Sequence, residues 1–162
     1  MWKRTVRKRT ICKTTLLSSF VIAAALCCDV GVQAADALKL QCPVCGKAAG
    51  KEHSAEHNGG TVCFCCDRCS NSFAARTKDF AAKANAQLVA SGQFKEVKCP
   101  LEGYRLNPLT AIEVAGVKVT FCCKGCKNVV AHANRDEQID LVFNDKAFKK
   151  GFERTAGEAK QR

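Results

Sequence analysis

The sequence predicts a small α+β protein built from two tandem metal-stapled modules, each with a cysteine knuckle, a β-hairpin and an α-helix. Ten of the 13 cysteines follow residue 34, a density typical of domains held by disulfides or metal. The cysteine pattern occurs twice, 57 residues apart and without a gap. Each copy has a turn signal between two short segments and then a helical segment. Apolar residues at alternate positions, or three or four apart, predict these elements.

The N-terminal 34 residues have the pattern of a secretory signal peptide. A basic stretch (1–13) precedes 13 mostly apolar residues (16–28), and Val32 and Ala34 stand at −3 and −1 of a predicted cut. A spanning helix needs about 20 apolar residues. We therefore expect cleavage near Ala34, a periplasmic or secreted protein and no stable membrane insertion. A lipoprotein or a retained anchor is the less favoured alternative.

The charge pattern argues against a nucleic-acid partner. Of 26 basic and 15 acidic residues, six basic and one acidic residue lie in residues 1–34, which leaves a net charge of only +6 on the remainder. Acidic residues are interleaved there, and no basic run has the aromatic neighbours typical of nucleic-acid binding. A solvated, mildly cationic surface accounts for this composition.

The internal repeat defines the predicted modules. From Cys42 to Asp79, 13 of 38 positions are identical to those 57 residues later. We expect modules over residues 40–92 and 97–143, followed by a C-terminal helix and a polar tail over residues 144–162. The matching segments are Cys42-Pro43-Val44-Cys45-Gly46 with Cys99-Pro100-Leu101-Glu102-Gly103, and Phe64-Cys65-Cys66-Asp67-Arg68-Cys69 with Phe121-Cys122-Cys123-Lys124-Gly125-Cys126.

In the first copy, Asn58-Gly59-Gly60 predicts a hairpin turn, although the incoming arm over residues 51–54 is polar. One helix is expected to start near Cys66 to Cys69 and to end at Ser91-Gly92. Its apolar face is predicted from spacings of three or four residues. The residues on this face are Phe73, Thr77, Phe80, Ala84 and Leu88.

In the second copy, apolar residues alternate on either side of Ala115-Gly116, which predicts a second hairpin. A weaker helix is expected from about Lys124 with a break around Asn134. A short terminal helix is then expected to pack back, and the last ten residues are polar. The alternating residues are Ile112, Val114, Val117, Val119 and Phe121, and those of the terminal helix are Phe143, Phe148 and Phe152.

Each module is too small to offset its chain entropy unaided, so a staple is required. The spacing favours metal over disulfides. A turn such as Cys42 to Cys45 directs two sulfurs into one tetrahedral site, and Cys65 and Cys69, four residues apart at a helix start, supply a second pair. The amides at a helix N-terminus also lower thiol pKa values, which favours the thiolate that binds metal.

This order of motifs resembles the TRASH domain, a treble-clef-like heavy-metal-binding module related to YHS domains. Cys-Pro-x-x-Gly is followed by a hairpin and by Phe-Cys-Cys-x-x-Cys with a helix, over residues 42–84 and 99–141. The resemblance implies metal ligands in both modules. For the first they are Cys42, Cys45, Cys65 and Cys69 with Cys66 as a further candidate, and for the second Cys99, Cys122 and Cys126 with Cys123 as a further candidate.

Glu102 breaks the four-cysteine pattern of the second module, since it stands where the first has Cys45. A carboxylate is an acceptable zinc ligand, but such a site is weaker and more open than four thiolates. Either Glu102 ligates, or Cys123 does, or the position is vacant for exchangeable metal. The alternative is that Glu102 is a surface residue in a degenerate copy.

Further donors cluster in the first module, where His53, His57 and Cys63 suggest a second, labile site. Residues four apart in a strand are separated by about 13 Å, too far for one ion without a bend. Two exposed histidines are therefore the favoured interpretation. His132 stands alone on a predicted helix, and we assign it no role.

These features favour a non-enzymatic, exported metal-binding protein for heavy-metal handling, buffering or sensing. Zn²⁺ is the expected ion and Cu⁺ the main competitor, because adjacent thiols suit a soft ion. A protein partner in metal trafficking fits this role. The main alternative is a protein-interaction domain with structural zinc. Thiol-redox chemistry at Cys42–Cys45 or Cys66–Cys69 and a disulfide scaffold are less favoured. No phosphate-cradling loop or paired carboxylates indicate an enzyme.

Overall fold

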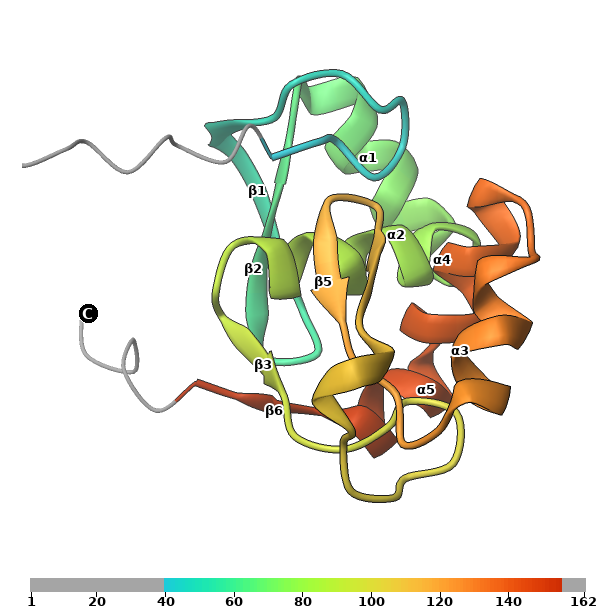
Figure 1. Cartoon of the computed structure of the whole chain (residues 1–162). Coiled ribbons are helices and arrows are strands. Elements are labelled where there is room, and N and C mark those ends of the chain that lie inside the picture. Colours follow the sequence, from blue (N-terminus) through green and yellow to red (C-terminus); the bar gives the residue numbers. More distant parts are fainter. Residues whose placement is uncertain (1–39, 156–162) are drawn as a thin grey trace, which may run out of the picture. The chain divides into compact units, whose positions relative to one another are not determined.

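The computed structural model describes residues 40–155, so the predicted signal peptide (1–34) and the end of the polar tail (156–162) lie outside the described residues. This part of the chain is a small α+β protein with five α-helices and short antiparallel strand pairs, as the sequence predicts (Figure 1). None of its described helices combines the length and apolar character needed to cross a membrane. In chain order the elements are β1 (Gly50–His57), β2 (Gly60–Phe64), α1 (Asp67–Ala75), α2 (Thr77–Ala90), β3 (Phe94–Glu96), the 3₁₀ turn η1 (Pro108–Thr110), β4 (Ile112–Val114), β5 (Val117–Val119), α3 (Lys124–Ala131), α4 (Arg135–Phe143), α5 (Asp145–Gly151) and β6 (Phe152–Arg154).

Both predicted hairpins are confirmed, and they turn in the same way. Asn58 and Gly59 join β1 to β2 with φ of 49° and 79°, and Ala115 and Gly116 join β4 to β5 with φ of 53° and 79°. Two consecutive positive φ values are typical of a type I′ turn, whose twist matches that of the paired strands. The polar incoming arm is compatible with the first hairpin because much of β1 lies at the surface.

Ala115 is a poorer turn residue than its counterpart Asn58. A left-handed backbone brings an alanine Cβ close to the following carbonyl, whereas Asn accepts this conformation. We expect Ala115→Asn to raise the free energy of unfolding by about 0.5–1 kcal/mol, measured by urea denaturation. Gly116→Ala places a Cβ at φ 79° and should lower it. Unchanged midpoints for both variants would contradict this account of the turn.

The prediction of a single helix in the first copy is wrong, because the structure has two helices there. α1 ends at Ala75 and α2 begins at Thr77, with Arg76 between them at φ −139° and ψ 47°. The Thr77 hydroxyl donates to the Phe73 carbonyl (2.9 Å), one of the acceptors that the end of a helix leaves free. The break changes the helix direction while Phe73 and Leu88 both remain buried.

The break expected near Asn134 in the second copy is confirmed. α3 ends at Ala131, and Asn134 is the N-cap of α4. The Asn134 side chain accepts from the Glu137 amide (3.0 Å), and the Glu137 carboxylate accepts from the Asn134 amide (3.1 Å). This reciprocal capping box satisfies two amides that the start of a helix otherwise leaves free.

The two copies share one hydrophobic core. α2 of the first copy packs against α4 and β5 of the second, and side chains from both copies belong to one buried cluster. The equivalent residues Phe64 and Phe121 have no exposed surface. The buried Asn85 of α2 donates to the Phe143 carbonyl (2.9 Å) and accepts from Asn58 (2.8 Å). Apolar packing and buried hydrogen bonds therefore both cross from one copy to the other.

The C-terminal segment packs back through a short sheet onto β3, which lies between the two copies, and through the expected helix onto α2. α5 confirms the predicted helix and contains Phe148, but Phe143 ends α4 and residues 152–154 form β6, which pairs antiparallel with β3 (Figure 1). Phe148 lies with its ring centroid 4.8 Å from that of Phe94 and 5.4 Å from that of Phe152. The polar character of residues 153–155 does not prevent this pairing, because main-chain groups make the bonds.

A partly buried carboxyl group joins β3, between the copies, to the end of the second hairpin. Glu96 of β3 accepts a hydrogen bond from the Thr120 amide (2.9 Å) through Oε2, while Oε1 is buried without a partner among the described residues. Burial raises the pKa of Glu96 to about 7, although the Thr120 bonds act in the opposite direction. The folded protein therefore holds a proton that the unfolded chain releases near pH 4.5.

This pKa predicts a pH-dependent stability. Because the folded-state pKa is raised, the stabilisation from the protonated form is complete below about pH 4.5 and is lost as the pH rises through about 7. We expect Glu96→Gln to be more stable than the native chain by about 1–2 kcal/mol at pH 8, after discounting for solvent screening, and nearly equal to it at pH 5. Urea denaturation at both pH values measures the difference, and an equal difference at both would contradict the assignment.

Candidate metal centres

Four thiols of the first copy converge from three parts of the chain. Cys42 and Cys45 lie in the loop before β1, Cys65 follows β2, and Cys69 lies in the first turn of α1. Their sulfur atoms all lie within 4.8 Å of one another. Cys42 and Cys69 are buried, Cys65 is half-buried and Cys45 is exposed. The group therefore lies at the edge of the core.

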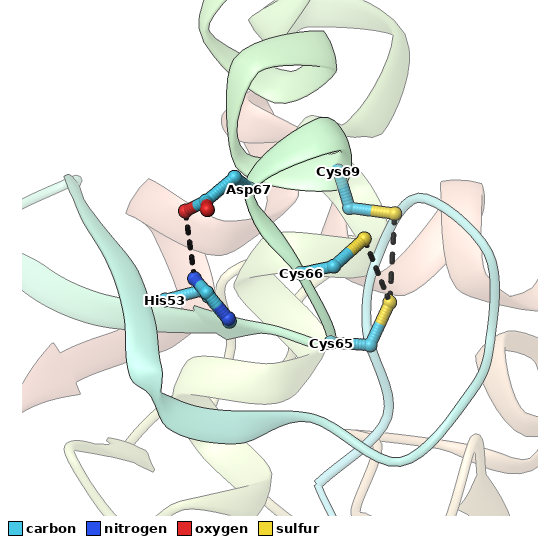
Figure 2. A network of polar contacts seen from close by, with 5 residues as sticks. All are labelled: His53, Cys65, Cys66, Asp67 and Cys69. Atoms are coloured by element: carbon cyan, nitrogen blue, oxygen red, sulfur yellow. Dashed lines mark hydrogen bonds and ion pairs between the residues drawn. The ribbon is translucent and has the colours of Figure 1, made fainter.

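The sulfur spacing fits a tetrahedral ion. Cys65 Sγ lies 3.3 Å from Cys45 Sγ and 3.6 Å from Cys69 Sγ. Figure 2 shows the Cys65 and Cys69 sulfurs facing each other at the start of α1. Sulfurs bound to zinc at about 2.3 Å stand about 3.8 Å apart in a regular tetrahedron. The donor set is thus compatible with a soft metal ion after small side-chain rotations.

A glycine closes the cysteine knuckle of each copy, which comprises residues 42–46 in the first copy and 99–103 in the second. The Gly46 amide donates to the Cys42 carbonyl (2.8 Å), and the Gly103 amide donates to the Cys99 carbonyl (2.7 Å). The two glycines have φ of 73° and 77°, a conformation that residues with a Cβ rarely adopt. This explains why the glycine recurs in the second copy although Cys45 does not.

Backbone amides stabilise one thiolate of the first group. Burial raises the pKa of Cys42, but hydrogen bonds from the amides of Cys65, Cys45 and Val44 outweigh it and lower the pKa to about 7. The contact with the Cys45 sulfur raises the pKa of Cys65 to about 12, and burial raises that of Cys69. Several adjacent sulfurs ionise together only beside a cation. A bound cation would favour full ionisation of this group.

The second copy brings together three thiols. The sulfurs of Cys99, Cys122 and Cys126 lie within 4.8 Å of one another, with 3.7 Å between those of Cys122 and Cys126. Burial raises the pKa of Cys99, but hydrogen bonds from the amides of Glu102, Cys122 and Leu101 together have a larger, opposite effect, so the net shift of the pKa is downward. Glu102 is exposed and its carboxylate lies outside this group. The group is one donor short of a tetrahedral set.

The two remaining candidate ligands lie at helix N-caps. Cys66 precedes α1 and Cys123 precedes α3, and neither belongs to a group of mutually close donors. Cys123 Sγ accepts a hydrogen bond from the Cys126 amide (3.5 Å), and Cys66 Sγ lies 3.7 Å from the Cys65 sulfur (Figure 2). The amides of the first helical turn lower the pKa of both thiols.

The imidazoles of the first hairpin have separate partners. His53 Nδ1 lies 2.7 Å from the Asp67 carboxylate, on the side of the helix start away from the sulfurs (Figure 2). The His57 ring packs edge-on against Phe73 with centroids 5.5 Å apart, and burial lowers the pKa of His57. Cys63 is buried, which raises its pKa. Both histidines are half-buried rather than exposed, and neither joins a thiol group in residues 40–155.

A buried glutamine that no sequence motif indicates positions the first knuckle. Gln87 Nε2 donates to the carbonyls of Gln41 and Cys63, both at 2.8 Å, and Oε1 accepts from the Cys63 amide (2.7 Å). Gln41 immediately precedes Cys42, so Gln87 joins the knuckle to β2. The available sequence signal was an amide within the apolar helical run over residues 84–90.

All ten cysteines within residues 40–155 are free thiols. The chain matches no family model, no curated protein and no solved structure. The resemblance to TRASH domains therefore rests on the sequence motifs.

Proposed function

We propose that this chain is an exported, non-catalytic metal-binding protein with two unequal thiolate sites. The observation that carries the proposal is the convergence of four cysteine sulfurs within 4.8 Å. These sulfurs come from a loop, a strand end and a helix start, so their proximity is not a by-product of sequence adjacency. Thiolates in this number are typical ligands of soft or borderline ions.

Zinc is the proposed ion of the first site. Four thiolates in a tetrahedral arrangement are typical of structural zinc, and the site places Cys42 and Cys69 in the core. Cu⁺ is the competing ion, because it accepts fewer thiolates and suits pairs such as Cys65 and Cys66. Replacing the cysteines of the site one by one distinguishes the two ions, because zinc needs more of the four thiolates than Cu⁺ does.

The second site is proposed as the exchangeable one. It offers three thiolates, so an ion bound there keeps a position for another ligand. Such a site gains and loses metal faster than a closed one, which suits heavy-metal handling, buffering or sensing. A closed first site and an exchangeable second site are both compatible with the TRASH-like motifs of the two copies.

Export is the part of the proposal that rests on residues 1–34. Their basic stretch, apolar run and small residues support a secretory signal cut near Ala34, and hence a periplasmic or secreted metal carrier. A protein that accepts or delivers the ion is the expected partner. N-terminal sequencing of the exported product tests the cut, and a product that retains residue 1 would contradict it.

Structural zinc in a protein-interaction domain is the second candidate. The packing favours it for the first site, because Cys42 and Cys69 are part of the shared core and Gln87 clamps the knuckle beside them. In that case both ions would resist mild chelation, and the second site would show no faster exchange than the first.

The test is a metal count on the purified full chain under reducing conditions, before and after graded chelation. We expect about two ions per chain, one of which leaves first. The equivalent substitutions Cys69→Ser and Cys126→Ser assign them: Cys126→Ser should retain the tightly held ion and lose the exchangeable one. A folded, metal-free protein with its cysteines paired would overturn the proposal in favour of a disulfide-stapled domain.

A further inference from the structure

An open cleft of about 610 Å³ reaches the second thiol group at Cys126. It is lined by Cys126 of that group, by Glu102 and Cys123, and by Lys146 and Lys150 of α5. Its apolar lining comes from the second knuckle, α3, α4 and α5, and consists of Pro100, Leu101, Val129, Leu141 and Ala147. Clefts of about 300–1,000 Å³ with apolar walls and a few polar groups are typical of small-molecule sites.

The chain leaves the second thiol group one donor short. Glu102 replaces the fourth cysteine, and its exposed carboxylate lies outside the group. Cys123 Sγ accepts a hydrogen bond from the Cys126 amide (3.5 Å) and also lies outside the group. Soft ions favour sulfur over carboxylate oxygen, so a thiol that enters through the cleft is a better fourth ligand than Glu102.

The charges of the cleft favour an anionic ligand. Lys150 Nζ donates a hydrogen bond to the Leu101 carbonyl in the second knuckle, and the Lys150 side chain packs closely over Gly103. Lys146 lines the same cleft, and neither lysine forms an ion pair within residues 40–155. Two ammonium groups thus face a single carboxylate, that of Glu102, and attract a ligand that carries carboxylates of its own.

We propose that this cleft binds a low-molecular-weight thiol carrying carboxylates, whose sulfur completes the donor set of Cys99, Cys122 and Cys126 while a carboxylate pairs with Lys146 and Lys150. The proposal deepens the proposed function and rests on metal binding by the second group. On binding, the thiol gives its proton to solvent and its sulfur becomes a metal ligand, with no change of oxidation state. The second site would then bind its metal together with a small thiol rather than as a bare ion.

The experiment uses the full chain loaded with two equivalents of Co²⁺ without oxygen, and glutathione as the probe. Thiolate-to-cobalt absorbance reports the number of sulfur ligands. We expect glutathione to increase it with saturation at one equivalent per chain. Lys146→Met should weaken glutathione binding about tenfold through loss of a charge-assisted contact. Lys149→Met is the matched control, since Lys149 is exposed on α5 but does not line the cleft.

The internal repeat supplies a second control. Glu102→Cys restores the four-cysteine pattern of the first copy, so this variant should show the higher absorbance without glutathione and no further increase with it. S-methylglutathione, which has the carboxylates but no free thiol, should leave the absorbance of the native chain unchanged. Both controls separate ligation by sulfur from binding of the peptide elsewhere.

The outcomes separate this inference from the proposed function. Binding of two cobalt ions with no response to glutathione would overturn the inference and leave the metal sites standing. Binding of one ion or none to the native chain would contradict the proposed second site itself. A four-ligand cobalt spectrum without glutathione that is lost in Glu102→Gln or Cys123→Ser would show closure by the chain and overturn the external ligand.

Discussion

Cys65→Ala leaves the first site with three thiolates, so we expect its ion to be lost on mild chelation and residues 40–155 then to unfold as a whole. Cys65 Sγ lies at the centre of its group, 3.3 Å from the Cys45 sulfur and 3.6 Å from the Cys69 sulfur. A structural zinc ion contributes about 10–16 kcal/mol to folding, whereas a domain has a total stability of only about 5–15 kcal/mol. The free energy of folding lost with this ion is therefore larger than the packing of the shared core can offset.

Cys63→Ala is the matched control for this prediction. Cys63 is a buried thiol of β2, two residues before the half-buried Cys65, but it lies outside both thiol groups. Its replacement should cost about 1 kcal/mol through lost packing and leave the metal count unchanged. Metal content and far-UV circular dichroism measure both effects. A Cys65→Ala protein that keeps its secondary structure and melting temperature after its metal has been removed by mild chelation would show that the first site is not a staple.

The unfolding should be a single transition that includes the second copy. α2 and α4 pack against each other, and Phe64 and Phe121 lie in one buried cluster. The second copy therefore loses part of its core when the first unfolds. Two separate transitions on chelation would contradict this coupling.

Gln87→Ala is expected to lower the free energy of unfolding by about 3 kcal/mol and to weaken metal binding at the first site. The substitution leaves the Cys63 amide, the Cys63 carbonyl and the Gln41 carbonyl without their partner and opens a cavity. It also frees the segment that leads into Cys42. Urea denaturation with excess zinc measures the stability, and competition with a chromophoric chelator measures the affinity.

Gln93→Ala provides an unusually close control. Gln93 makes the same paired contacts to β2, accepting from the Thr61 amide (2.7 Å) and donating to the Thr61 carbonyl (2.8 Å), but in an exposed setting. Water can replace these bonds, so its loss should cost less than about 1 kcal/mol. Equal effects of the two substitutions would show that burial of the Gln87 bonds is not what makes them important.

Several parts of the candidate sites follow from short segments. Spacing alone predicts that the two sulfurs of each pair converge on one site. This applies to Cys42 and Cys45 at the glycine turn and to Cys65 and Cys69 at a helix start. The sequence does not decide the status of Cys66, Cys123 and Glu102. Cys66 and Cys123 directly follow a donor in the chain, and Glu102 lies three residues after one, yet the helix-cap geometry and the exposed knuckle place them outside the groups.

The sequence by itself determined the α+β class, both hairpins, the break at Asn134 and the two sets of cysteines, because turn preferences, apolar periodicity and cysteine spacing act over a few residues. Only the tertiary structure decided that the copies share one core, that β6 pairs with β3, that Gln87 clamps the first knuckle and that a cleft opens beside Cys126. These features join residues 20 to 60 positions apart. Their energy depends on which distant surfaces become buried together, and no local pattern encodes that choice.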